Sequence, residues 1–356
     1  MAEGLRVAVL GLGRMGSVHA RNLLELERET GACRLAALVD PDEARARRFA
    51  REHGCEAMVL RSLGELAQAG ICEGAVIATP TEMHREHAER LIAAGYRVLL
   101  EKPLTGTIEA DEAFAAALDR DYPRAVMLGF QRRFDAPLRH AKELLEKGCI
   151  GRVFKIFSAL EDSGPPPDGY RSSGLLADMS VHNVDEILWL TGCTPKAAVA
   201  IGSRVYGHRV STCAEDFDDA LLLMWFEQDL VAQVQVSRNH VSGYRVETVV
   251  FGEEGQIHVG RFDQRPTDVV VEAYGRRKDK EPIAYYTFSM AEERADGPEF
   301  LDRFGPAYRA EIYAFVECCR ERRPFPVTHV DGLRAQRVIE AGMRRLITAE
   351  GAGLQV

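Results

Sequence analysis

The sequence lacks several features that define common classes of protein. Its eight cysteines are scattered, none lies in a C-x-x-C pair and no signal peptide precedes them, so we expect reduced thiols in a cytoplasmic protein. No apolar run approaches the roughly 18 residues that a membrane span requires. Neither a G-x-S-x-G nucleophile elbow nor a G-x-x-x-x-G-K-S/T phosphate loop occurs. These absences predict a soluble protein that uses neither of these catalytic motifs.

The sequence also has fewer basic than acidic residues. The 45 Lys and Arg residues face 54 Asp and Glu residues, which gives a formal net charge of -9. A nucleic-acid partner is not expected, because neutralising phosphates requires clustered positive charge. The 356 residues, 46% of them hydrophobic, can bury sizeable cores, and a chain of this length favours two domains.

The pattern of apolar runs changes along the chain. Short apolar runs at 5–11, 34–40, 74–79 and 97–103 alternate with helical patterns, which is typical of a parallel sheet covered by helices. Later stretches are strand-like and separated by glycines or charged turns; they lie at 152–159, 220–226, 230–237, 245–252 and 256–260. Helical patterns lie at 175–192, 308–322 and 332–347. We predict an α/β Rossmann domain plus an α+β domain with an open, mainly antiparallel sheet.

A glycine motif follows the first predicted strand. Gly11, Gly13 and Gly16 form G-x-G-x-x-G between that strand and a helix, where backbone N–H groups can approach a pyrophosphate. Asp40 ends the next strand, close to the expected spacing of about 20 residues for the acid that binds the adenosine ribose. A carboxylate there predicts NAD rather than NADP, because it would repel a 2′-phosphate. Three arginines follow, and they either soften that repulsion or form the solvated face of a helix: Arg45, Arg47 and Arg48.

The stretch VIATPTEMHREHAERLIAAGYRVLLEKPL at 76–104 resembles the Gfo/Idh/MocA family of sugar and cyclitol dehydrogenases, which includes inositol 2-dehydrogenases. The resemblance extends through GFQRRFD at 129–135 and DMSVHNVDEILWL at 178–190 to the last helices, and so covers nearly the whole chain. It implies an NAD-binding Rossmann domain over 1–125 and a substrate and oligomerisation domain over 126–325. It also implies that the C-terminal helix, within 326–356, returns to the first domain, and that the protein is a homodimer or homotetramer.

The resemblance implies three catalytic residues. Lys102 matches the lysine of E-K-P, and Asp178 and His182 match a D-x-x-x-H pair. An i, i+4 spacing puts the last two on one face of a helix. The carboxylate can then orient the imidazole, which takes the proton from a substrate hydroxyl as hydride leaves the same carbon.

Other matching positions complete the predicted site. The cofactor-binding set comprises the three glycines with Arg14, Met15, Asp40, Thr79, Pro80, His84, Glu101, Lys102 and Gln131. The substrate-binding set comprises the three catalytic residues with Arg132, Glu161, Asp162, Asp185 and Tyr244. Some of these residues could have structural roles instead: Arg133 and Asp135 could form an ion pair, Asp185 could satisfy a helix end, and Tyr244 could be an ordinary strand tyrosine. His84 and His87 are too few ligands for zinc, so we expect no metal.

The predicted reaction moves a hydride between NAD and a ring secondary alcohol of a sugar or cyclitol. From 161 to 186 six acids face one arginine, Arg171, and the segment 215–219 adds four more acids. If these acids line one cleft, they favour a substrate with ammonium groups, such as an amino sugar or an aminoglycoside. They are otherwise solvated surface, and the substrate is then a neutral cyclitol such as inositol. A non-catalytic NAD-binding regulatory protein is the alternative from another class.

Overall fold

The computed structural model describes residues 4–165, 173–205, 216–261, 267–276, 281–290 and 298–347. The chain forms two compact units. Unit 1 comprises Met1–Gln131 and Ala307–Leu333, and unit 2 comprises Arg132–Pro306 and Arg334–Val356. The division of the chain at 125 and 325 stays a prediction.

Unit 1 is built on a parallel sheet, as predicted. Its strands are β1 (Leu5–Leu10), β2 (Cys33–Val39), β3 (Met58–Leu60), β4 (Gly74–Ile77), β5 (Arg97–Glu101) and β6 (Val126–Gly129). They lie in the order β3-β2-β1-β4-β5-β6 and every neighbouring pair is parallel. The order reverses between β1 and β4, and ligands of doubly wound sheets bind at the carboxyl ends of the strands beside such a reversal.

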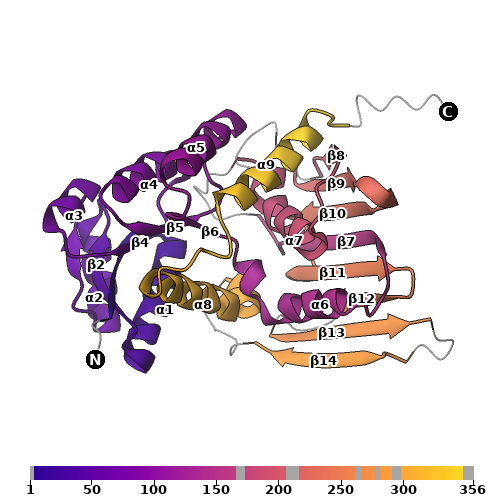
Figure 1. Cartoon of the computed structure of the whole chain (residues 1–356), viewed down its shortest axis with the longest axis horizontal. Helices are drawn as coiled ribbons and strands as arrows, with labels where there is room; N and C mark the ends of the chain where they lie inside the picture. Colours follow the sequence, from indigo (N-terminus) through magenta and orange to yellow (C-terminus); the bar gives the residue numbers. More distant parts are fainter. Residues whose placement is uncertain are drawn as a thin grey trace. The chain divides into compact units, whose positions relative to one another are not determined.

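Helices cover both faces of this sheet. They are α1 (Arg14–Thr30), α2 (Glu43–His53), α3 (Leu63–Ala69), α4 (His84–Ala93) and α5 (Ile108–Asp121). In Figure 1, α4 and α5 lie above the sheet and α1 lies below it. Residues 307–320 of α8 (Glu299–Arg320) pack on the side of α1, where Tyr308 contacts His19 edge to face. The strands are hydrophobic along their length because both of their faces are buried.

Unit 2 is built on the predicted open, mainly antiparallel sheet. Its strands are β7 (Val153–Glu161), β8 (Ala197–Ser203), β9 (Asp219–Trp225), β10 (Val231–Ser237), β11 (Arg245–Gly252), β12 (Gly255–Val259), β13 (Asp268–Gly275) and β14 (Ala284–Ser289). The order is β14-β13-β12-β11-β7-β10-β9-β8, in which the β7–β10 pair is parallel and the other neighbours are antiparallel. β8, β13 and β14 were not among the predicted strands.

The helices of unit 2 lie on one face of its sheet (Figure 1). They are α6 (Ala136–Glu146), the π-helical turn η3 (Leu176–Ser180), α7 (Val181–Thr191) and the later part of α9 (His329–Met343). α7 ends at Gly192, as predicted, with a left-handed φ of 69° at that glycine. α8 begins at Glu299, well before the predicted residue 308, because Pro306 lies inside the helix instead of ending it.

The opposite face of this sheet presents large apolar side chains. Ile201, Trp225, Val231 and Tyr285 are all exposed. The first three alternate with buried residues along their strands, and Tyr285 alternates with Tyr286, whose ring contacts His140 of α6, so all four point away from the helices. Among the described residues, no helix is both long and apolar enough to cross a membrane.

Candidate functional site

The glycine loop between β1 and α1 is shaped by two of its three glycines. Gly11 has a φ of +83°, and a Cβ at this position would lie 2.6 Å from the carbonyl oxygen of Ala78. A Cβ at Gly16 would lie 1.6 Å from the carbonyl oxygen of Gly11. Both positions therefore require glycine for the fold itself.

Gly13 differs from the other two glycines. It is the N-cap of α1, its φ is -68°, and a Cβ there would meet nothing within 4 Å. Neither the fold nor the backbone conformation requires glycine at this position. The open space before the helix N-terminus fits a pyrophosphate that approaches the main chain closely, so the loop is suited to hold the pyrophosphate of a dinucleotide.

Asp40 holds the glycine loop from the end of β2. It is only 2% exposed; its Oδ2 accepts a hydrogen bond from the Leu12 N–H at 2.7 Å, and its Oδ1 accepts one from the Asp42 N–H at 2.9 Å. Arg45 Nη1 lies 3.3 Å from Asp40 Oδ2. Arg47 instead pairs with Glu43 on the exposed face of α2. The contact between Asp40 and an adenosine ribose stays a prediction.

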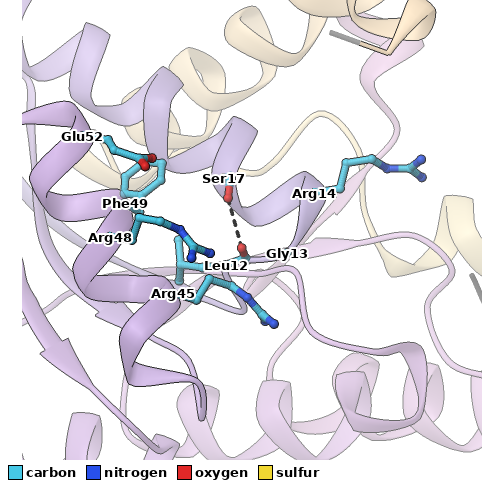
Figure 2. Close-up of a pocket in the computed structure, with 8 residues that line it drawn as sticks. All are labelled: Leu12, Gly13, Arg14, Ser17, Arg45, Arg48, Phe49 and Glu52. Carbon is cyan, nitrogen blue, oxygen red and sulfur yellow. Dashed lines mark hydrogen bonds between the residues drawn. The ribbon is translucent and has the colours of Figure 1, made fainter. Parts of the chain in front are cut away.

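A cavity of about 470 Å³ opens beside this loop. It is lined by Leu12, Gly13, Arg14, Ser17, Arg45, Arg48, Phe49 and Glu52 (Figure 2). In the figure Arg45 and Arg48 lie close to Leu12, whereas Arg14 points away from them, and Ser17 Oγ donates to the Leu12 carbonyl oxygen at 3.1 Å. Three arginines and one glutamate give this lining a net positive charge, which suits an anionic ligand in a chain that is acidic overall.

His84 ties together the loops that follow β4 and β5. Its Nδ1 lies 2.8 Å from the Pro103 carbonyl oxygen, and its Nε2 lies 3.0 Å from the Thr79 carbonyl oxygen. Burial lowers the pKa of His84, against the two carbonyl contacts that raise it. Because both ring nitrogens face carbonyl oxygens, neither is aimed at a metal. No cluster of three or more possible metal ligands occurs in the described part of the chain. Thr79 is half-buried, its Oγ1 lies 3.2 Å from His87 Nδ1, and Pro80 is exposed.

Glu101, at the end of β5, forms a buried hydrogen bond that the sequence did not indicate. His19 Nε2 of α1 lies 2.6 Å from Glu101 Oε1, and His19 is fully buried. The Lys102 main-chain N–H donates to Glu101 Oε2 at 3.2 Å. Burial would raise the pKa of Glu101, but the His19 hydrogen bond and the charges of His19 and Lys102 hold it below its ordinary value. A charged Glu101 thus lies directly before the half-buried Lys102.

Two further members of the predicted cofactor set lie in unit 1. Met15 is half-buried in the first turn of α1. Gln131 is 3% exposed, and its Oε1 is buried without a hydrogen-bond partner among the described residues. Such an acceptor fits a group that arrives with a bound ligand.

Asp178 and His182 do not lie on one regular helix. Asp178 belongs to the π-helical turn η3, and His182 lies in the first turn of α7. A shared face at an i, i+4 spacing requires regular α-helical geometry, which the π-helical turn interrupts. Asp178 Oδ2 accepts a hydrogen bond from Arg238 Nη2 at 3.1 Å. π-helical turns inside helices are frequent at functional sites.

The two possible partners Arg133 and Asp135 do not pair with each other. Arg133 donates two hydrogen bonds to Asp185, whereas Asp135 accepts two from Arg303 at 2.6 and 2.8 Å. That ion-pair hypothesis is therefore wrong. Asp185 is buried in its own ion pair, so its contact with a substrate hydroxyl stays a prediction.

Arg132 and Tyr244 are two further members of the predicted substrate set; Arg132 is 1% exposed and Tyr244 is half-buried. Arg132 donates to Glu186 Oε2 at 2.7 Å, while its buried Nε and Nη2 have no partner among the described residues. Tyr244 lies just before β11 instead of inside a strand. Burial, then the charge of Asp162, raises the pKa of Tyr244, and Arg132 opposes this.

Four of the ten acids counted in the segments 161–186 and 215–219 are paired with arginines. Each of four buried or nearly buried carboxylates forms an ion pair with an arginine; the pairs are Glu161 with Arg245, Asp178 with Arg238, Asp185 with Arg133 and Glu186 with Arg132. Glu161 also accepts a hydrogen bond from Gln235 at 2.7 Å. Asp168, Arg171 and Glu215 lie outside the described residues. The prediction of a cationic substrate counted only the arginine within 161–186, whereas these four carboxylates pair with arginines from other segments.

The fold and the glycine loop define the protein as a dinucleotide-binding protein of the Rossmann type. The family model for the oxidoreductase family with an NAD-binding Rossmann fold matches residues 5–130, and the GFO/IDH/MocA C-terminal domain model matches residues 138–258. The chain belongs to the Gfo/Idh/MocA family.

Characterised relatives span almost the whole chain. A scyllo-inositol 2-dehydrogenase (NAD(+)) of Bacillus subtilis is 29% identical over 93% of this chain and 91% of its own length. A myo-inositol dehydrogenase of Streptomyces leeuwenhoekii is 31% identical over 88% of this chain and 87% of its own. The crystal structure of scyllo-inositol dehydrogenase from Lactobacillus casei with NAD(H) and scyllo-inositol has a TM-score of 0.79 and 26% identity, and covers 96% of this chain and 97% of that one. The predictions of the family, the fold class, an NAD-dependent dehydrogenase and its cofactor are confirmed.

Proposed function

We propose that the protein oxidises a ring secondary alcohol of a neutral cyclitol of the inositol type, with NAD as hydride acceptor. The observation that carries the proposal is the D-x-x-x-H pair at the η3–α7 junction, where the carboxylate of Asp178 is held in a buried ion pair. A protein that only senses NAD needs the glycine loop and Asp40 but no such proton-transfer pair.

Each catalytic residue has a separate role in this proposal. NAD, when bound, accepts the hydride from the alcohol carbon. Lys102 binds the substrate oxygen through its ammonium group, with the charged Glu101 beside it. His182 takes the hydroxyl proton, and Asp178 orients the imidazole for that transfer.

The substrate class rests on charge and on similarity. Because Glu161, Asp178, Asp185 and Glu186 each pair with an arginine, they leave no strong negative field to select an ammonium group. The relatives named above are scyllo- and myo-inositol dehydrogenases, which favours a neutral polyol. An amino sugar or aminoglycoside is accordingly not our proposed substrate.

Initial rates of NADH formation at 340 nm test the proposal. We expect turnover with myo-inositol or scyllo-inositol, and a higher kcat/KM for at least one of them than for glucosamine, at low and at high salt. A rate with glucosamine that exceeds both inositols and falls as salt increases would restore the cationic substrate. NAD binding without turnover of any polyol would favour the regulatory alternative.

We also propose that the exposed sheet face of unit 2 pairs with a second copy of the chain, giving a dimer or a tetramer. Ile201, Trp225, Val231 and Tyr285 provide an apolar surface of the kind that marks protein contacts. Light scattering should give a mass of two or four chains, and Trp225→Glu should shift it towards one. A wild-type mass of one chain would refute this.

A further inference from the structure

We propose that Arg238 is a positioning residue for the proton transfer: it fixes the carboxylate of Asp178, which in turn orients His182. The inference rests on the proposed function and extends it to a residue that no motif indicated. Arg238 Nη2 donates to Asp178 Oδ2 at 3.1 Å, and the two side chains are 5% and 14% exposed. A charge-assisted hydrogen bond shielded from water to this degree is strong and directional.

The backbone around Arg238 is held on both sides. Arg238 directly follows β10, an inner strand that lies between β7 and β9. Its main-chain N–H donates to the Asp218 carbonyl oxygen at 2.8 Å. The carbonyl oxygen of Ser237, one residue earlier, accepts from the Asp162 N–H at 2.9 Å. The guanidinium therefore reaches η3 from a rigid base on the sheet.

Asp178 lies in a segment whose own backbone is irregular. η3 is a π-helical turn. Two hydrogen bonds lie at its start: the Leu175 N–H donates to Asp216 Oδ1 at 3.0 Å, and the Asp178 N–H donates to the Gly174 carbonyl oxygen at 2.9 Å. A π-helical turn replaces the i→i+4 hydrogen bonds of a regular helix by i→i+5 bonds. The hydrogen bond from Arg238 holds the Asp178 side chain in this turn from the sheet.

The chemistry of the pair requires an ionised, oriented carboxylate. Burial favours the neutral form of a carboxyl group, whereas a guanidinium at hydrogen-bond distance favours the charged form. With Oδ2 held by Arg238, the orientation of the whole carboxylate is set, and Asp178 can select one tautomer of the imidazole. Arg132 and Arg133 are equally buried or nearly so, but their carboxylates do not belong to the D-x-x-x-H pair.

A double-mutant cycle distinguishes positioning from a merely structural ion pair. Arg238→Gln, Asp178→Asn and the double variant are compared by kcat with NAD and myo-inositol or scyllo-inositol, and folding is checked by thermal melting. We expect each single change to lower kcat by roughly 10- to 100-fold, as for the loss of one charged hydrogen bond. The double variant should be no slower than Asp178→Asn within about twofold, because Arg238 acts only through Asp178.

Further variants make the cycle specific. Arg238→Lys should recover much of the lost rate, because it keeps the charge. Arg238→Met, which removes the charge but keeps a long side chain, replaces Arg238→Gln in the cycle if the latter does not fold. The matched control is Arg261→Gln, which removes another arginine that follows a strand and pairs with a carboxylate, Glu272; kcat should stay at the wild-type value. NADH affinity should be unchanged in all variants. Multiplicative losses in the double variant, or wild-type kcat in Arg238→Gln, would overturn the inference.

A measurement without substrate separates this inference from the proposed function. The ¹⁵N chemical shifts of the His182 ring report its tautomer and are assigned with His182→Ala. Arg238→Gln and Asp178→Asn should move these shifts in the same direction. If Asp178→Asn moves them and Arg238→Gln leaves them as in the wild type, Arg238 is not a positioning residue, whatever the substrate proves to be. If both move them but no polyol is oxidised, the inference stands and the proposed function fails.

Discussion

Replacing Gly13 by Ala should separate cofactor binding from folding. The backbone at Gly13 is one that any residue adopts, and a Cβ would meet nothing within 4 Å. Alanine is a poorer N-cap than glycine by a few tenths of a kcal/mol or more, but it gains about 0.4–1 kcal/mol from the unfolded state. The two effects nearly cancel, so the free energy of unfolding should change by less than about 1 kcal/mol.

The same methyl group should weaken NADH binding. It occupies the space in which the main chain would approach the pyrophosphate, and we expect a loss of at least about tenfold in affinity, or 1.4 kcal/mol. Gly16→Ala is the matched contrast, because its Cβ would lie 1.6 Å from the Gly11 carbonyl oxygen. The start of α1 must then retreat by roughly 2 Å to restore contact distance, which should cost about 1–3 kcal/mol of stability.

Thermal melting and a fluorescence titration with NADH test both variants. The expected result is a wild-type melting temperature with weak binding for Gly13→Ala, and a lowered melting temperature for Gly16→Ala. Wild-type NADH affinity in Gly13→Ala would refute the assignment of the cradle. A fall in melting temperature equal to that of Gly16→Ala would refute the claim that Gly13 is not required by the fold.

Three further changes have defined outcomes. Lys102→Ala should lower kcat by orders of magnitude and leave NADH affinity nearly intact; unaltered turnover would remove Lys102 from the mechanism. Arg45→Ala should weaken NADPH binding by about tenfold relative to NADH binding, because it removes the positive charge beside Asp40. The control Arg47→Ala should leave the affinities for NADPH and NADH unchanged, because Arg47 pairs with Glu43 instead. Equal losses of affinity for both cofactors in Arg45→Ala would contradict this prediction. Asp111→Asn should stabilise the protein by up to about 3 kcal/mol above pH 6 and have little effect below pH 4.

The Asp111 prediction follows from its surroundings. Asp111 is 1% exposed and burial raises its pKa to about 6, although the Thr105 hydroxyl donates to it at 2.6 Å. A folded-state pKa above the unfolded value gives stability that is present below pH 3.8 and is lost as the pH rises through about 6. Asparagine does not ionise and so avoids this loss. The free energy of unfolding in urea is measured from pH 4 to pH 8 for the wild type, for Asp111→Asn and for the control Glu109→Gln, which changes an exposed residue. If the free energies of Asp111→Asn and the wild type change in parallel with pH, the prediction is contradicted.

The fold was predictable where local pattern and tertiary structure agree. The strand ending at Asp40 and the helix ending at Gly192 are marked by hydrophobic runs and by glycine, whose effects are local. α8 was predicted too short because Pro306 usually ends a helix but here lies inside one. β14 escaped prediction because Tyr285, Tyr286 and Thr287 are exposed, so the edge strand has little buried alternation.

The motifs of the candidate site could be predicted from the sequence, but the side chains that pair with the motif residues could not. The glycine loop and Asp40 are consecutive parts of one βαβ unit, so spacing alone relates them. His19 with Glu101 and Arg238 with Asp178 join segments more than 50 residues apart, and nothing local in the sequence encodes such a pairing. For the same reason the arginine partners of four acids in unit 2 could not be predicted from the sequence; these acids are Glu161, Asp178, Asp185 and Glu186.

The most direct test of the central claim is the transfer of a label from the ring carbon to the cofactor. The enzyme is incubated with NAD and myo-inositol or scyllo-inositol that carries deuterium on its ring carbons, and the reduced cofactor is analysed by mass spectrometry. We predict one deuterium in each NADH formed, and no labelled NADH with His182→Ala. NADH without deuterium, or no NADH from either cyclitol, would contradict the claim that this chain removes a hydride from a cyclitol ring.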